Sequence, residues 1–211
     1  MLPFKILANN VLNLTDARYF AARGADYICL NELDSNNNLS PEEVLAIADW
    51  IDGPMTLLHF ISDDYFIEFS EKFNPDGWIF NKQDAGLPPS QVFDHLTFLN
   101  HTISDFKSVN QNQLVGTEIV LGFDYLILDI KQTGLTLEEV ESSGALPILQ
   151  TVCAASAVFL DAIIKSDEDI KILEKINPEG IVLHGGKEDE VGVKVYDELD
   201  NVFDLLEDNF V

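Results

Sequence analysis

The sequence predicts an α/β fold, a single-domain (β/α)8 TIM barrel over residues 1–211, and three features of the chain favour it. Eight short apolar runs recur between helical patterns. Each run is too continuously apolar for a strand with one face in water, so we expect parallel strands buried on both faces. No G-x-G-x-x-G or G-x-x-x-x-G-K-[ST] loop occurs, which removes the usual support for an open nucleotide-binding sheet. A chain of 211 residues suits one such barrel.

The expected strands are rich in β-branched, aliphatic and aromatic residues, which favour extended backbone. They are Phe4–Ala8, Tyr27–Asn31, Met55–Phe60, Trp78–Asn81, Thr97–Asn100, Tyr125–Ile130, Pro147–Gln150 and Gly180–His184.

The expected helices are marked mainly by their first turns. Ser40-Pro41-Glu42-Glu43 and Thr136-Leu137-Glu138-Glu139 each place a capping hydroxyl three residues before an acid. The first helix begins near Thr15 and is closed by Gly24. Apolar stripes predict the others, through Phe66, Phe69 and Phe73, through Ile170 and Leu173, and through Leu199, Val202, Phe203 and Leu206. The segment 104–122 has no clear stripe and is expected to be a short helix with a loop.

The stretch from Ala145 to Ile164 approaches the length of a membrane span. It contains Pro147, Gln150 and Asp161 among other polar residues, so a strand followed by a helix explains it better. The N-terminal residues have no basic region ahead of a long apolar core, and we expect no signal peptide. Cys29 and Cys153, the two cysteines, lie in apolar runs, which is typical of buried thiols in a reducing compartment. We therefore expect a cytoplasmic protein.

Acidity is the most unusual property of the composition. The chain has 37 Asp and Glu against 12 Lys and Arg, a formal net charge of -25. Such a field repels phosphate backbones and anionic lipids, so neither nucleic acid nor a membrane is expected as a partner. An anionic ligand would need a local pocket of donors, whereas the acidity itself is typical of solvated helix faces.

Three segments resemble phosphoribosylanthranilate isomerase, a barrel that performs an Amadori rearrangement in tryptophan synthesis. The first joins F-K-I-L at residues 4–7, D-A-R-Y-F-A-A-R-G-A-D-Y-I at 16–28 and L-S-P-E-E-V at 39–44. The second, Y-L-I-L-D at 125–129, is similar to the sixth strand with its terminal aspartate, and the third is G-I-V-L-H-G-G-K-E-D-E-V-G-V-K-V at 180–195. The resemblance implies the barrel fold and names Asp129 as the general acid.

The departures from the family concern its catalytic groups. Leu7 stands where the resemblance requires a cysteine as general base, and leucine cannot exchange a proton. Ser35-Asn36-Asn37-Asn38 replaces an arginine that would hold the anthranilate carboxylate. The glycine pair expected after the seventh strand reads Thr151-Val152-Cys153-Ala154. The turn His184-Gly185-Gly186 keeps small residues suited to binding a phosphate through backbone amides.

Other polar residues near the strand ends are weaker candidates for the functional site. His59, His101 and His184, with Asp129, could surround a metal or a sugar phosphate, but no short His-x-x-x-His pair occurs and packed or solvated histidines are the default. No metal site and no cofactor are therefore predicted. Asn9 and Asn10 can position a ligand but do not abstract protons at neutral pH.

Three functions remain open at this point. The first is a diverged isomerase-like barrel with weak or lost Amadori activity and a remaining pocket for a phosphorylated small molecule, in which Asp129 and the residues His184, Gly185 and Gly186 form the site. The second is an active phosphoribosylanthranilate isomerase that uses His59 or His184 as a substitute base. The third is a non-catalytic barrel that binds a protein partner through its acidic exterior.

Overall fold

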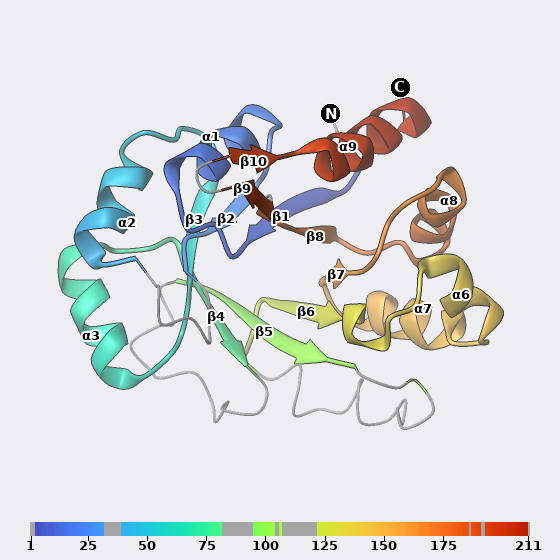
Figure 1. Cartoon of the computed structure of the whole chain (residues 1–211). Helices are drawn as coiled ribbons and strands as arrows, with labels where there is room; N and C mark the ends of the chain where they lie inside the picture. The colour runs from blue at the N-terminus through green and yellow to red at the C-terminus, as the bar shows by residue number, and fades with distance from the viewer. Residues whose placement is uncertain are drawn as a thin grey trace.

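A computed structural model of the chain contains a closed barrel of eight parallel strands in sequence order (Figure 1). The structure describes residues 3–31, 39–81, 95–103, 106, 122–185, 187–190 and 193–210. The barrel strands are β1 (Lys5–Asn9), β2 (Tyr27–Cys29), β3 (Met55–His59), β4 (Gly77–Asn81), β5 (Leu96–Thr102), β6 (Tyr125–Asp129), β7 (Val158–Asp161) and β8 (Gly180–His184). β1 pairs with both β2 and β8, which closes the ring and confirms the predicted fold.

Helices cover the outside of the barrel. They are α1 (Leu14–Ala22), α2 (Pro41–Ala48), α3 (Asp63–Lys72), α6 (Leu137–Ser142), α7 (Leu146–Ala155), α8 (Asp167–Ile176) and α9 (Asp197–Phe210), with a short 3-10 turn, η3 (Lys131–Thr133). Both predicted capping boxes are present: the Ser40 hydroxyl accepts from the Glu43 amide, and the Thr136 hydroxyl from the Glu139 amide. Gly24 closes α1 with a φ of 76°. Most of the segment 104–122 lies outside the described residues.

The prediction for the seventh strand is wrong. Pro147–Gln150 belongs to helix α7, and the strand follows it at Val158–Asp161, so the stretch 145–164 is a helix followed by a strand rather than the reverse. Proline suits the first turn of a helix, where its missing N–H would have no partner, and Pro147 occupies that turn. The shorter apolar run V-F-L-D is buried along its whole length.

Side chains that point into the barrel form its inner core. This core consists of Leu7, Tyr27, Cys29, Leu57, Ile79, Phe98, Ile127, Phe159 and Val182. Two glycines make room for it near the N-terminal ends of the strands. A Cβ at Gly180 would lie 2.4 Å from a ring carbon of Phe159, and one at Gly77 would lie 2.6 Å from the Leu96 carbonyl oxygen. Alternate strands fill the same level with Tyr27 and Tyr125, whose hydroxyl oxygens are 3.5 Å apart.

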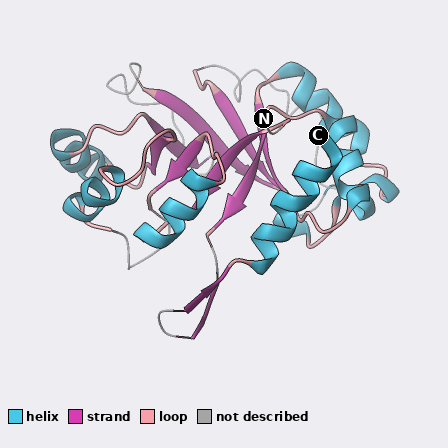
Figure 2. Cartoon of the chain, turned by 90° about the horizontal axis from the view of Figure 1, so that it is seen from above, coloured by secondary structure: helices cyan, strands magenta, loops and turns pink. Residues whose placement is uncertain are grey.

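The last helix is held against the first. Tyr196 stacks on Tyr19 with 4.2 Å between ring centroids, and the Tyr19 hydroxyl donates to Asp200 over 2.7 Å. Between β8 and α9 lies a two-stranded antiparallel hairpin, β9 (Lys187–Glu190) and β10 (Val193–Val195), which the sequence did not predict. Figure 2 shows this hairpin projecting from the body of the barrel. Among the described helices, none has the length and apolar character needed to cross a membrane.

Candidate functional site

A polar residue lies at the C-terminal end of every barrel strand or within two residues of it. These residues are Asn9, Asn31, His59, Asn81, Asn100, Asp129, Asp161 and His184. Each follows a member of the inner core by two positions, and side chains two apart in a strand share one face. The seven side chains that lie within strands therefore point into the barrel. With Asn31, which follows β2 by two residues and bonds to His59 at the end of β3, we call this set the mouth ring. Active sites of this fold lie at the same end.

The mouth ring has two layers of four residues. In this fold, alternate strands contribute the side chains of one layer. The strand registers place Asn9, His59, Asn100 and Asp161 in the lower layer, from β1, β3, β5 and β7. The upper layer is Asn31, Asn81, Asp129 and His184, from the even strands.

His59 is the most enclosed imidazole of the ring, with 3% of its surface exposed. Its Nε2 lies 3.0 Å from Asn9 Oδ1. That oxygen also accepts the Asn10 backbone N–H, so it is an acceptor in its bond with His59 as well. His59 Nε2 therefore carries the proton, and Nδ1 has a lone pair. Burial, and secondarily His184, lowers the pKa of His59 to about 4. The ring is therefore neutral at physiological pH.

Asn31 has a structural role in the upper layer. Its Oδ1 accepts the His59 backbone N–H over 2.6 Å, and its Nδ2 donates to the His59 carbonyl and to the Tyr65 hydroxyl. The side chain thus holds the end of β3 against the end of β2, and it orients the residue that carries the buried imidazole.

Asp129 ends β6, where the sequence placed it. Its Oδ1 accepts the Lys131 backbone N–H over 3.0 Å, and its Oδ2 accepts the Thr102 hydroxyl over 3.3 Å. Burial, and secondarily the charge of Asp161, raises the pKa of Asp129. A carboxyl group with a raised pKa keeps its proton to higher pH, as a general acid must.

A histidine and a carboxylate are paired beside Asp129. Nε2 of His184 lies 2.7 Å from Asp161 Oδ2, and Asp161 has 5% of its surface exposed. Asp161 Oδ1 is 3.7 Å from the Lys131 ammonium. Asp129 and Asp161 are register partners on adjacent strands, so the mouth holds two carboxylates close to one lysine and one imidazole.

The turn after β8 was predicted to bind phosphate. Gly185 packs against the buried carboxylate of Asp16 at the start of α1: a Cβ at Gly185 would lie 2.8 Å from Asp16 Oδ2. A carboxylate on this side of the turn repels a phosphate. Gly186 lies outside the described residues, and phosphate binding here stays a prediction.

The first strand contributes Asn9 to the mouth, while Leu7 lies deeper. Leu7 has no exposed surface and belongs to the inner core. The residues compared with the family's glycine pair, Thr151-Val152-Cys153-Ala154, are in helix α7 and do not follow the seventh strand. The true β7 is followed by Ala162-Ile163-Ile164, which also lacks glycine. The loop Ser35-Asn36-Asn37-Asn38 lies outside the described residues.

Asp161, Asn31, Asn81 and Asn100 are site residues that the sequence did not reveal. Asp161 was missed because the seventh strand was placed eleven positions too early. The signal was present: V-F-L-D at 158–161 is an apolar run that ends in aspartate, as Y-L-I-L-D at 125–129 is. His101 follows Asn100 and therefore has the opposite orientation in β5. In the described ranges, no three His, Cys, Asp or Glu side chains are grouped as ligands for a metal ion.

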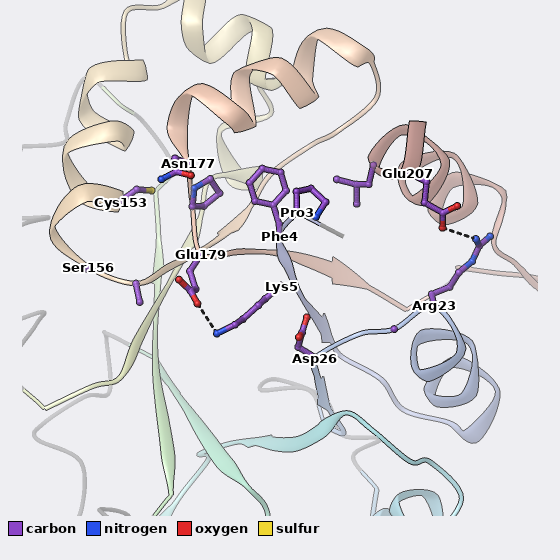
Figure 3. A pocket seen from close by; sticks show the side chains of 14 residues that line it. Pro3, Phe4, Lys5, Arg23, Asp26, Cys153, Ser156, Asn177, Glu179 and Glu207 are labelled. Atoms are coloured by element: carbon purple, nitrogen blue, oxygen red, sulfur yellow. Dashed lines mark ion pairs between the residues drawn. The ribbon is translucent and has the colours of Figure 1, made fainter. Parts of the chain in front are cut away.

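A cavity of about 890 Å³ lies at the opposite end of the barrel (Figure 3). Four of its five charged side chains face one another in pairs: Lys5 with Glu179 over 2.6 Å, and Arg23 with Glu207 over 3.8 Å. Conserved chemistry in this fold is built on the loops at the strand C-termini, whereas the N-terminal face serves stability. The mouth ring is therefore the better candidate site.

Comparisons with known proteins bear on the fold. No family model and no curated protein matches the sequence. Among solved structures, N-(5'-phosphoribosyl)anthranilate isomerase from Pyrococcus furiosus is similar with a TM-score of 0.69 and 13% identity, over 97% of this chain and 98% of that one. The isomerase from Thermococcus kodakaraensis has a TM-score of 0.70 and 13% identity, over 98% and 99%.

The Thermotoga maritima phosphoribosyl anthranilate isomerase gives a TM-score of 0.67 and 14% identity, over 97% of this chain and 99% of that one. Inosine 5' monophosphate dehydrogenase from Legionella pneumophila gives a TM-score of 0.55 and 12% identity, over 87% of this chain and 58% of that one. At such identities the likeness shows the fold alone: this chain has a TIM barrel like that of phosphoribosylanthranilate isomerases.

Proposed function

We propose that this chain is a diverged barrel of the phosphoribosylanthranilate isomerase type, with weak or absent Amadori activity and a mouth that binds a small polar molecule. The observation that carries the proposal is the chemistry of β1. This strand offers an amide, Asn9, to the mouth and the buried Leu7 beneath it. Neither group accepts a proton at neutral pH.

Asp129 supports one half of the reaction implied by the resemblance. Its raised pKa suits a general acid that protonates a sugar ring oxygen. The second half needs a base that removes a proton from the neighbouring carbon. General bases contribute roughly 10²–10⁴ in rate, so an acid without its partner leaves activity far below that of a complete pair.

An active isomerase is the second candidate, and the pair of His184 and Asp161 favours it. A carboxylate 2.7 Å from an imidazole orients the ring and fixes which nitrogen faces the mouth's acid. His184 also lies in the same layer of the mouth ring as Asp129. It is a better substitute base than His59, because the pKa of His59 is lowered to about 4 and a base that weak removes protons poorly.

Turnover of phosphoribosylanthranilate by the purified chain, together with rescue of a tryptophan-requiring strain that lacks the isomerase, separates the two candidates. We expect no rescue by folded protein and no turnover above that of a Asp129→Asn variant. Turnover that Asp129→Asn abolishes would overturn the proposal. If His184→Asn abolished it as well, the second candidate would replace the first. Glu179→Gln, at the opposite end of the barrel, is the matched control.

The third function open to the sequence was a barrel that binds a protein partner. Its acidic exterior is the argument for it, and it stays a prediction. Capture of a partner that survives Asp129→Ala would support it.

A further inference from the structure

Unpartnered hydrogen-bonding atoms are concentrated in the mouth ring. Among the described residues, five buried side-chain atoms lack a hydrogen-bond partner, and three of them are His59 Nδ1, Asn100 Oδ1 and Asp161 Oδ1. Each such atom costs about 1–3 kcal/mol. Because proteins normally satisfy buried polar groups, three exceptions at one end of a barrel require an explanation.

The three atoms are all acceptors. His59 Nδ1 has a lone pair because Nε2 carries the proton toward Asn9. Asn100 Oδ1 is the carbonyl end of an amide whose nitrogen donates to Asn81 over 3.0 Å. Asp161 Oδ1 belongs to a carboxylate whose other oxygen is 2.7 Å from His184. The group that satisfies them must therefore bring N–H or O–H donors.

The three acceptors also share one layer. His59, Asn100 and Asp161 come from β3, β5 and β7, which contribute to the lower layer together with β1. The bond from His59 to Asn9 reaches across the intervening strand β2, so side chains of this layer meet inside the barrel. A single compact molecule can thus contact more than one of them.

The charges around the layer favour a cation. Asp161 and Asp129 are carboxylates, and the basic groups close to them are Lys131, whose Nζ is 3.7 Å from Asp161 Oδ1, and His184. The helices that follow β1, β2, β3, β6 and β7 start on the mouth side, and acids fill their first turns. The whole chain has a net charge of -25. This field attracts cations and repels phosphate.

We propose that Asn9, His59, Asn100 and Asp161 form a subsite for a compact amine that carries several hydroxyl groups and no phosphate, such as an amino alcohol or an unphosphorylated amino sugar. The ammonium group is placed at Asp161 Oδ1, and hydroxyl groups donate to Asn100 Oδ1 and His59 Nδ1. This inference rests on the proposed small-molecule function of the mouth and names the class of its ligand.

Three small probes test the proposal. Tris(hydroxymethyl)aminomethane has one amine and three hydroxyl groups, 1,1,1-tris(hydroxymethyl)ethane replaces the amine by a methyl group, and inorganic phosphate is an anion without an amine. Each is titrated at neutral pH while the side-chain resonances of His59 and Asn100 are followed by NMR. We expect the amine to shift both sets of resonances and the neutral triol to bind about tenfold more weakly, since a charge-assisted bond is roughly twice as strong as a neutral one. Phosphate should leave both unchanged.

Two variants assign the binding to this layer. Asp161→Asn keeps the shape of the side chain and removes its charge, so the amine should bind about tenfold more weakly while the triol changes little. His59→Phe removes the Nδ1 acceptor and should weaken both probes. If Asp161→Asn fails to fold, His59→Phe still tests the layer, because an apolar ring of similar shape replaces the imidazole. Glu179→Gln should bind like the unaltered chain.

The failures are distinguishable. If phosphate shifted the mouth resonances at lower concentration than the amine, the ligand class would be wrong while a small-molecule mouth remained. If no probe shifted them, the amine subsite would be overturned, and the proposed function would still be judged by its own test. Amine binding unaffected by either variant would place its site elsewhere. Turnover of phosphoribosylanthranilate is measured separately and decides the catalytic half of the proposed function.

Discussion

The odd-numbered strands carry two layers of inward side chains that differ completely in chemistry. Leu7, Leu57, Phe98 and Phe159 form an apolar layer, and two residues further along the same strands Asn9, His59, Asn100 and Asp161 form a polar one. The apolar layer packs without exposed surface, while three atoms of the polar layer lack hydrogen-bond partners among the described residues. Two residues along each strand therefore separate a layer that stabilises the fold from a layer suited to binding.

Removal of a large side chain from the apolar layer should have the largest effect. Phe98→Ala leaves a cavity in a fully buried layer and should lower the free energy of unfolding by about 3–5 kcal/mol. Asn100→Ala on the same strand loses the bond to Asn81 and should cost about 1 kcal/mol or less. Urea denaturation of both variants measures the contrast, and equal costs would show that the polar layer is also structural.

The pH dependence of stability should reveal the buried imidazole. The pKa of His59 is lowered to about 4 in the folded chain from 6.5, so as the pH falls the unfolded chain binds this proton first. Stability is therefore lost between pH 6.5 and 4, by up to about 3 kcal/mol. Asp129 acts in the opposite sense, because its pKa is raised and its folded form gains stability as it is protonated.

Unfolding measured across this range in the unaltered chain and in His59→Phe isolates the contribution of the imidazole. The variant should lose less stability on acidification, while its stability at neutral pH should change by about 1 kcal/mol or less, because an unpartnered polar atom is removed together with one hydrogen bond. The same acid sensitivity in both proteins would contradict the assignment.

Gly77 and Gly180, which lie beneath the apolar layer, should tolerate no side chain. Gly180→Ala brings a Cβ to 2.4 Å from the Phe159 ring and 2.5 Å from the Lys5 carbonyl oxygen, and should cost about 1–3 kcal/mol. Gly24→Ala meets no atom within 4 Å and is strained only by its φ of 76°, at about 1 kcal/mol. Thermal and urea unfolding of the two variants measures these costs. A smaller cost for Gly180→Ala than for Gly24→Ala would show that Gly180 is not crowded.

The smallest expected effect concerns a helix start at the mouth side. Thr136→Ala removes the capping hydroxyl of α6 and should cost about 1 kcal/mol. Thr151→Ala, on the exposed surface of α7, should change stability by about 0.5 kcal/mol or less. If the two substitutions had equal effects on stability, the capping box of α6 would contribute little to the stability of the fold.

The closed barrel and seven of its strands could be predicted because buried parallel strands are continuously apolar and helix caps have clear signatures. The seventh strand could not, since L-P-I-L and V-F-L-D are both short apolar runs and periodicity does not separate a buried strand from a buried helix segment. That error hid Asp161 and so the pair with His184. The hairpin β9 and β10 consists largely of charged residues, which gave no strand signal.

The site was only partly predictable for a different reason. Asp129 and His184 were identified because their strands resemble those of a known family. Asn81 and Asn100 are single amides, and their orientation depends on the register of the closed barrel. The local sequence specifies which residues end a strand. It does not specify which of two successive polar residues, such as Asn100 and His101, points inward.

The protonation of His59 tests the mouth ring most directly, and a long-range ¹H–¹⁵N NMR spectrum of its imidazole measures it. We predict a neutral ring between pH 7 and 5, with Nε2 protonated toward Asn9 and Nδ1 unprotonated. A ring that titrates near 6.5, or one that carries its proton on Nδ1, would contradict the acceptor layer and the ligand class inferred from it.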